Sequence, residues 1–173
     1  MACVINSGVT LDCLDGVGGV DTIYITEYEN LNTFTADTSG QVTTFTLTSG
    51  KKFWTFNLEK EDAQLAEAFS MAEGGSGVYA QTLTFSIKKL SYDKRHLLKL
   101  VSNNRLLVIV KDANGNYLLM GKYKGAKLTG IDANTGKALG DANGYNAVTI
   151  TSNEPVPMYF VQSSLMTALT TPA

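Results

Sequence analysis

The chain has 173 residues, of which 44% are hydrophobic and 17% are charged, and its formal net charge is −2. This length fits a single domain, residues 1–173, that is large enough to bury a core. The near-neutral charge and the lack of a basic run argue against tight nucleic-acid binding, which requires phosphate neutralisation, and no apolar segment approaches the ~20 residues that span a bilayer.

Residues 1–19 are predicted to form an N-terminal arm that docks on a neighbour or folds back as an edge strand. The arm lacks Lys, Arg and a long apolar run, so it does not resemble a secretory signal. Without an export signal, its two cysteines, Cys3 and Cys13, are expected to be reduced structural thiols. The glycines at 16, 18 and 19 precede a strand pattern, which favours a hinge or bulge over a phosphate-binding loop.

Three strands are predicted in the next part of the chain. Residues 20–28 alternate in polarity, and residues 41–48 and 51–58 flank Ser49-Gly50, which indicates a second hairpin. The loop at 29–40 separates the first strand from this pair. Both faces of 51–58 carry aromatic side chains, so we expect this strand to be covered on both sides, with Trp54 in a core or an interface rather than in a ligand-stacking site.

The segment 59–72 is ambiguous between helix and strand. Its residue types favour a helix, but Leu65, Phe69 and Met71 also share one face of a strand. Because 78–89 alternates cleanly and follows the Gly-rich turn 73–77, we favour a strand that forms a long hairpin with 78–89.

One α-helix is predicted at residues 91–102. Ser91 is a suitable N-cap, and Asp93 lies in the first turn, where a negative charge complements the helix dipole. Leu97, Leu98 and Val101 are expected to form the buried stripe. His96 has no Ser, Cys or carboxylate at a catalytic spacing, so we interpret it as a surface or partly packed histidine.

The stretch 105–120 is predicted to be a central β-hairpin. Its first run, Leu106 to Val110, is apolar on both faces and rich in β-branched residues, which suits a buried strand. Asn114-Gly115 then provides a strong turn signal, because both residues adopt a positive φ at low cost.

The remaining chain is predicted to contain a long loop, two strands and a tail. The loop at 122–144 is rich in glycine and repeats Asp-Ala-Asn, but it lacks the regular spacing and closing Glu of a calcium loop. A strand at 145–151 ends before two prolines. Residues 158–161 are expected to form a short edge strand, and 162–173 a mobile tail.

The sequence contains no linear catalytic or metal-binding motif. With one histidine and no cluster of metal ligands, we expect no catalytic, cofactor-binding or metal-binding residue, and we expect the protein not to be an enzyme. The fold class is therefore mainly β: an antiparallel β-sandwich or small barrel with one flanking α-helix at about 91–102.

A resemblance rests on five segments in their order along the chain. These are LDCLDGVGGV (11–20), TIYITEY (22–28), YAQTLTFSIKKL (79–90), RLLVIVKDANGNYLLMG (105–121) and GDANGYNAVTITSNEPVPMYFV (140–161). Together they resemble bacteriophage structural proteins of the tail, near the tail tube-like and tail-hub or ring proteins, such as those of the crAss-like phages.

The resemblance implies a phage tail tube-like fold that self-assembles into rings of a tail, tail hub or head–tail connector. Such a ring forms the conduit for DNA during ejection. Its partners would be other copies, neighbouring tail or connector proteins and DNA in transient, non-specific passage. The subunit would be made in the host cytoplasm and reside in the virion, and the loops 29–40, 59–77 and 122–144, with the terminal arms, would link successive rings.

Two other functions stay open from the residues. A β-sandwich binding module for carbohydrate or a receptor would present exposed aromatic side chains in a groove, with Trp54 and Tyr145 as the first candidates. A hydrolase would place a site around His96 without a linear motif.

Overall fold

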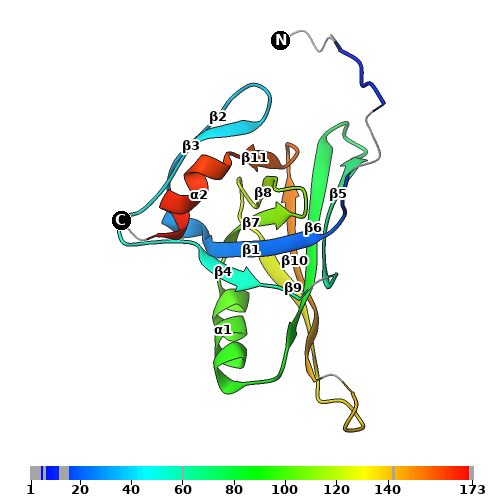
Figure 1. Ribbon diagram of the computed structural model, residues 1–173. Helices are drawn as coiled ribbons and strands as arrows, with labels where there is room; N and C mark the ends of the chain where they lie inside the picture. Colours follow the sequence, from blue (N-terminus) through cyan, green and yellow to red (C-terminus); the bar gives the residue numbers. More distant parts are fainter. Residues whose placement is uncertain (1–4, 6, 12–15, 60, 142, 172–173) are drawn as a thin grey trace.

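The computed structural model describes residues 5, 7–11, 16–59, 61–141 and 143–171. Within these residues the chain forms eleven strands and two α-helices (Figure 1). The elements in order are β1 (Val20–Glu27), η1 (Tyr28–Asn30, a 3-10 turn), β2 (Leu31–Ala36), β3 (Gln41–Leu47), β4 (Trp54–Asn57), β5 (Ala63–Met71), β6 (Gly77–Lys88), α1 (Tyr92–Asn103), β7 (Leu106–Asp112), β8 (Tyr117–Met120), β9 (Lys127–Asn134), β10 (Gly144–Glu154), β11 (Tyr159–Val161) and α2 (Ser163–Thr170).

The strands form two sheets, which confirms the mainly β, sandwich-like fold class. Sheet A has the order β2-β3-β11-β8-β7-β1-β4, and sheet B has the order β5-β6-β10-β9. All neighbouring strands are antiparallel except β11 and β3, which are parallel. Sheet A lies between sheet B on one face and α2 on the other (Figure 1).

Strand β7 is the centre of both cores, as its two-sided apolarity predicts. Leu106, Val108 and Val110 face sheet B and α1, in a core that includes Leu83, Phe85 and Ile150. Leu107 and Ile109 face the opposite way, in a second core with Val42, Phe53 and the α2 residues Met166 and Leu169. Because successive side chains of a strand alternate in direction, five consecutive apolar residues are needed to fill both cores.

The central hairpin is confirmed as predicted. β7 pairs with β8, with Val110 opposite Leu118, and Gly115 in the turn has a φ of +87°. The turn is closed by Asp112, whose carboxylate accepts hydrogen bonds from the backbone N–H and the side-chain amide of Asn116.

The ambiguous segment is strand β5. It pairs residue for residue with β6 from Ala63, opposite Phe85, to Met71, opposite Gly77. Nine pairs in one register outweigh the helix preference of the individual residues, which amounts to only a few tenths of a kcal/mol each.

Helix α1 is confirmed within one residue at each end. Ser91 is its N-cap and accepts a hydrogen bond from the Lys94 N–H at 3.3 Å. Leu98 and Val101 are buried against the core between the sheets, but Leu97 is 41% exposed. The predicted buried stripe is therefore wrong at Leu97, which points along the outer side of the helix.

The hairpin predicted around Ser49-Gly50 is wrong. β3 pairs with β2 and β11, whereas β4 pairs with β1 at the far edge of sheet A. The connection crosses instead beneath α2, since Phe53 is buried in the second core and its N–H donates to the Leu169 carbonyl at 2.9 Å. Because the Phe53 side chain is buried beneath α2, the segment that follows β3 does not turn back to pair with it.

Two segments predicted as loops contain strands. In the segment 29–40, η1 and β2 precede a tight turn at Asp37, and β2 pairs with β3. In the segment 122–144, β9 pairs with β10 and Leu128 packs against the core between the sheets. Turn-forming residues in these segments interrupt the alternation that would predict a strand. In β9, for example, a glycine lies where the register with β10 shifts.

The mobile tail predicted at 162–173 is wrong for residues 163–170, which form α2. Leu165, Met166 and Leu169 follow helical spacing and close the second core. A second flanking helix is thus present in addition to α1. The preceding strand β11 is also not an edge strand, since it lies between β3 and β8.

The end of the N-terminal arm is fastened to the tip of the central hairpin. The Val17 N–H donates to Asn114 Oδ1 at 2.9 Å, and Asn114 Nδ2 donates to the Val17 carbonyl at 2.7 Å. Upstream, the described residues 5 and 7–11 are exposed. Cys3 and Cys13 lie outside the described residues, so their thiols have no structural description.

Candidate functional site

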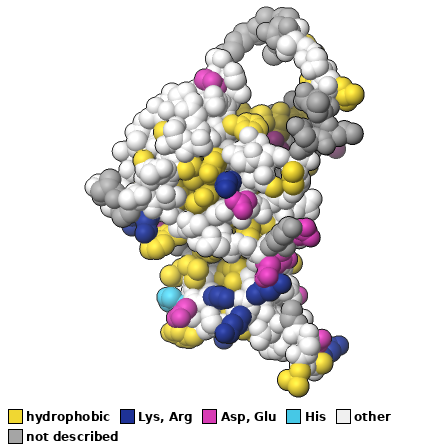
Figure 2. All heavy atoms as spheres, in the orientation of Figure 1, with side chains coloured by type: hydrophobic (Ala, Val, Ile, Leu, Met, Phe, Trp, Pro, Cys, Tyr) yellow, Lys and Arg dark blue, Asp and Glu magenta, His cyan; other side chains and the backbone are white. Residues whose placement is uncertain are grey.

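The histidine considered for a hydrolytic site lies on the exposed side of α1. The His96 ring stacks on Tyr92, with centroids 6.4 Å apart and planes 8° from parallel. Figure 2 shows Lys and Arg side chains near the histidine, in the lower part of the molecule where α1 lies. An exposed imidazole stacked on its helix neighbour has the geometry of a surface residue and not of a base held by a third group.

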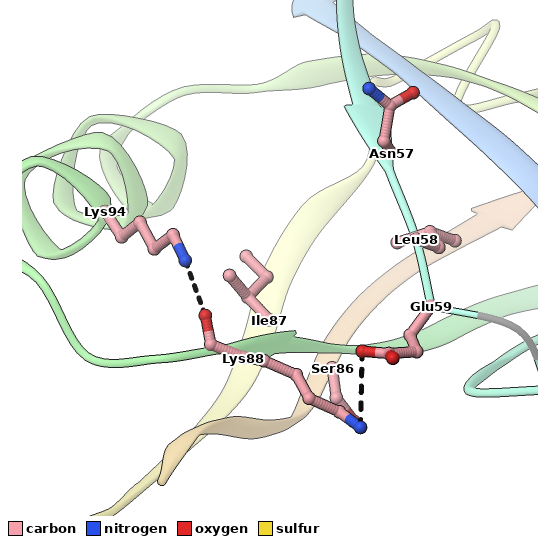
Figure 3. Close-up of a pocket in the computed structure, with 7 residues that line it drawn as sticks. All are labelled: Asn57, Leu58, Glu59, Ser86, Ile87, Lys88 and Lys94. Atoms are coloured by element: carbon pink, nitrogen blue, oxygen red, sulfur yellow. Dashed lines mark hydrogen bonds and ion pairs between the residues drawn. The ribbon is translucent and has the colours of Figure 1, made fainter.

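A polar hollow of about 500 Å³ lies between the end of β4, the end of β6 and the start of α1 (Figure 3). Its lining residues are Asn57, Leu58, Glu59, Ser86, Ile87, Lys88 and Lys94. Lysine and serine are residue types that anion-binding and nucleophilic sites use. The hydrogen bonds and ion pairs of these side chains show whether they are available for such a role.

The polar groups of this hollow are engaged with one another. Lys94 Nζ donates to the carbonyl oxygens of Lys88 and Lys89, and Lys88 Nζ lies 3.3 Å from Glu59 Oε2. The Ser86 hydroxyl donates to Asp62 at 3.1 Å. These contacts hold the β4–β5 and β6–α1 connections together, which is a structural role. The Ser86 hydroxyl has a carboxylate partner, but none of the residues that line the hollow is a histidine that could relay its proton.

A polar row crosses the inner face of sheet B, with Gln81 and Ser152 buried and Glu67 exposed at its β5 end, and no sequence pattern predicts it. Glu67, Gln81 and Ser152 are opposite one another on β5, β6 and β10. Gln81 Nε2 donates to Glu67 Oε1 at 3.1 Å, and Gln81 Oε1 accepts from the Gly121 N–H at 3.3 Å. Gln81 lies in the segment 78–89, which the sequence predicts to be a strand, but no linear signal marks its partners, which lie 14 to 71 positions away.

Glu154 extends this row as an enclosed carboxylate. It is 2% exposed and accepts hydrogen bonds from the Ser152 hydroxyl at 2.7 Å and the Tyr123 N–H at 3.0 Å. The Tyr123 and Tyr159 hydroxyls meet at 3.2 Å. Burial, then the Tyr123 hydrogen bond and the nearby Glu154 charge, raise the pKa of Tyr159 to about 12.

The polar row connects the β8–β9 turn to sheet B. Neither the hollow of Figure 3 nor the larger hollow beside the N-terminal segment is lined by Gln81 or Glu154. Substrate therefore has no path to these groups through either hollow. Buried polar groups that satisfy one another fix the alignment of packed layers, and we assign this role to the row.

The two aromatic residues considered for ligand binding have different environments. Trp54 is 63% exposed on the edge strand β4, with Lys52 Nζ 4.4 Å from its ring centroid. The prediction that this strand is covered on both sides is wrong for the single subunit, and the placement of Trp54 in an interface stays a prediction. Tyr145 is buried in the core between the sheets, so the two do not form one exposed groove.

Within the described residues, no group of three or more His, Cys, Asp or Glu side chains is arranged to hold a metal ion. None of the helices in this part of the chain is long and apolar enough to cross a membrane. Comparison with protein-family models, with curated proteins and with solved structures found no match.

The most distinctive surface is the pair of open edges of sheet B. β5 and β9 each have a neighbour on one side only, and they contain nine and eight residues. The edge strands of sheet A are β2 and β4. An unpaired row of backbone N–H and C=O groups is a template for another strand, so these edges are the candidate interaction site.

Proposed function

We propose that this chain is a non-enzymatic structural protein of a bacteriophage virion, which assembles into rings of a tail, tail hub or head–tail connector and forms a conduit for DNA. The observation that carries the proposal is sheet B, which ends in an unpaired strand at both edges. Its partners would be further copies, adjacent tail proteins and DNA in transit. The protein would be made in the host cytoplasm and reside in the virion.

Strand direction supports pairing between the two edges. The three neighbouring pairs in sheet B are antiparallel, so β5 and β10 run one way and β6 and β9 the other. If β9 of one copy lies beside β5 of the next, the joined sheet remains antiparallel throughout. Such a contact uses two different surfaces of each copy, and a repeated heterologous contact closes into a ring when its rotation divides a full turn.

The β5 edge has one of the devices with which soluble sheets prevent edge pairing, an inward-turned charge, and lacks two others. It contains neither proline nor lysine, and its one charged side chain, Glu67, is turned inward, where it accepts from the Met158 N–H at 2.8 Å and from Gln81. A nine-residue edge strand with one charged side chain favours aggregation of a monomer, whereas an assembling subunit can use it to pair with a neighbour.

The outer face of sheet B supports a role as a wall past which DNA moves. Its central positions alternate with the buried ones and carry small neutral side chains: Ala66, Ala68, Ala80, Thr82, Thr84, Thr149 and Thr151. Lys127 lies on the same face, opposite Thr151. Because affinity for a polyanion grows with the number of cations that contact phosphates, a face with few lysine or arginine side chains would let DNA slide.

The mass of the native assembly tests the proposal. We expect purified protein to form closed rings visible in micrographs and in native mass spectra. Replacing Ala66 and Ala68 by Lys places charges beside the β5 edge and should yield folded monomers. Thr38→Lys, at the exposed β2–β3 turn of sheet A, is the control and should retain rings. Wild-type protein that stays monomeric at high concentration would overturn the proposal.

One observation favours a binding module as the second candidate. Trp54 is exposed beside Lys52, and it is the only tryptophan of the chain. An exposed indole is a common stacking surface for sugars. A glycan screen with tryptophan fluorescence as the readout would detect such binding in the wild type, and unchanged fluorescence across the screen would dismiss carbohydrate as the ligand. Trp54→Ala should abolish the binding, which is followed by calorimetry because the variant contains no tryptophan.

A further inference from the structure

The hairpin formed by β9 and β10 projects from the body of the molecule. Gly144, the first residue of β10, is opposite Lys88, the last residue of β6. The described part of the connection, 135–141, therefore extends past the end of sheet B, and Figure 1 shows this hairpin as an extension beside α1.

The tip of this hairpin is ordered around Asp141. Its Oδ2 accepts hydrogen bonds from the N–H groups of Lys137 and Ala138, at 2.7 and 2.9 Å, and its own N–H donates to the Ala138 carbonyl. Leu139 lies inside this loop and is fully exposed, between the small residues Ala138 and Gly140. An apolar side chain held out on a closed turn makes no contribution to the fold of its own subunit.

A hollow of about 650 Å³ lies on another part of the molecule, between the N-terminal segment, the start of β5 and the central hairpin. Its apolar lining comes from Val17, Val20, Leu65, Val110, Leu118 and Met158. Glu61 and Asp112 also line it, and none of its lining residues is Lys or Arg. The hollow thus suits an apolar side chain that is accompanied by a positive charge.

We infer that Leu139 of one copy seats in this hollow of a second copy, an inference that rests on the edge pairing proposed above. In antiparallel pairing of β9 with a neighbour's β5, the end of β9 falls beside the start of β5. The tip follows the end of β9 directly, and Ala63, Gln64 and Leu65 at the start of β5 line the hollow. The exposed Lys137 would then approach the acidic rim of the hollow.

This contact would determine the register in which neighbouring copies pair. Edge pairing through backbone groups alone tolerates slippage, because the side chains on the outer face of sheet B are small and similar. A single leucine that fits one hollow fixes the register between copies. The hairpin tip therefore acts as the specificity element and the β5–β9 join as the scaffold.

The experiment compares Leu139→Asp with Leu100→Asp, which alters a leucine that is 48% exposed on the outer side of α1. Subunit dissociation constants are measured by dilution of rings. Loss of one buried leucine should raise the constant by about 10- to 100-fold, whereas Leu100→Asp should leave it unchanged. A Leu139→Cys/Gln64→Cys double variant, with Cys3 and Cys13 replaced by Ser, should form a disulfide-linked ladder of subunits on oxidation.

Each outcome separates the two proposals. Wild-type rings that Leu139→Asp leaves intact, without a cross-linked ladder, would overturn the tip-in-hollow contact and preserve edge pairing. Weakening by deletion of residues 1–15, with Leu139→Asp silent, would assign the hollow to the N-terminal arm and would also overturn the contact. Absence of wild-type rings would overturn the proposed function itself.

Discussion

Glu154 stands at the point where sheet B, the β8–β9 turn and the proline-containing connection meet. Its two carboxylate oxygens are each used, one by the Ser152 hydroxyl and the other by the Tyr123 N–H. A buried side chain that satisfies two donors cannot be removed without leaving both unpaired, and an unpaired buried donor costs more than a hydrogen bond contributes.

We predict that Glu154→Ala lowers the free energy of unfolding by about 2 to 3 kcal/mol, through the loss of two hydrogen bonds at a buried position. Urea unfolding followed by circular dichroism measures this change. Glu73→Ala, which removes an exposed glutamate in the β5–β6 turn, should change the free energy by less than about 0.5 kcal/mol. Equal effects of the two substitutions would show that Glu154 is not a connecting residue.

Val108 lies in the core between the sheets, so a substitution at this position tests that core. Its side chain is fully buried on β7. An aspartate there would place a charge in an apolar site at a cost of several kcal/mol, which is comparable with the whole stability of a domain, about 5 to 15 kcal/mol. We expect Val108→Asp to be insoluble or unfolded by circular dichroism, whereas Asn114→Ala, at the exposed turn, should fold. Folded, soluble Val108→Asp protein would contradict this core.

The tip of the β9–β10 hairpin is held by one ionisable group, Asp141. The hydrogen bonds from the Lys137 and Ala138 N–H groups hold the pKa of Asp141 below its usual value. A depressed carboxyl pKa means that the ionised form stabilises the folded tip. This stabilisation is present above the ordinary value of 3.8 and is lost as the pH falls through the lower folded-state pKa.

We therefore expect the amide resonances of Lys137 and Ala138 to shift together as the pH falls below about 4. An NMR titration from pH 7 to pH 2 follows this change. Asp141→Asn keeps an acceptor at the same place without a titrating proton, so its tip should show no such transition. A transition that persists in Asp141→Asn would assign the pH dependence to another group.

At the scale of the whole molecule, sheet A is covered on both faces and sheet B on one. The outer face and two edges of sheet B are left to solvent in the single subunit. An assembly that buries the edges stabilises the folded subunit by mass action, since only folded copies can pair.

This coupling predicts a melting temperature that rises with protein concentration. We expect Tm from calorimetry to increase by several degrees over a 100-fold range of concentration for the wild type. The Ala66→Lys/Ala68→Lys variant should melt at one temperature throughout that range. A wild-type Tm independent of concentration would contradict assembly through the folded subunit.

The sequence by itself determined the elements whose signals are local. Alternation and a short turn predict the β5–β6 hairpin and the β7–β8 hairpin at Asn114-Gly115, because adjacent residues form both the strand and its partner. Alternation also predicts β1 as a strand, but not its partners β7 and β4. The N-cap at Ser91 similarly positioned α1.

Tertiary structure alone decided the pairings and the polar row. Ser49-Gly50 carries a turn signal, yet burial of Phe53 beneath α2 separates β3 from β4. The residues 163–170 have helical spacing, but so short a helix is stable only because Met166 and Leu169 pack on the face of sheet A opposite sheet B. The Glu67, Gln81 and Glu154 network exists only once three distant segments meet, since hydrogen bonds between remote residues leave no period in the sequence.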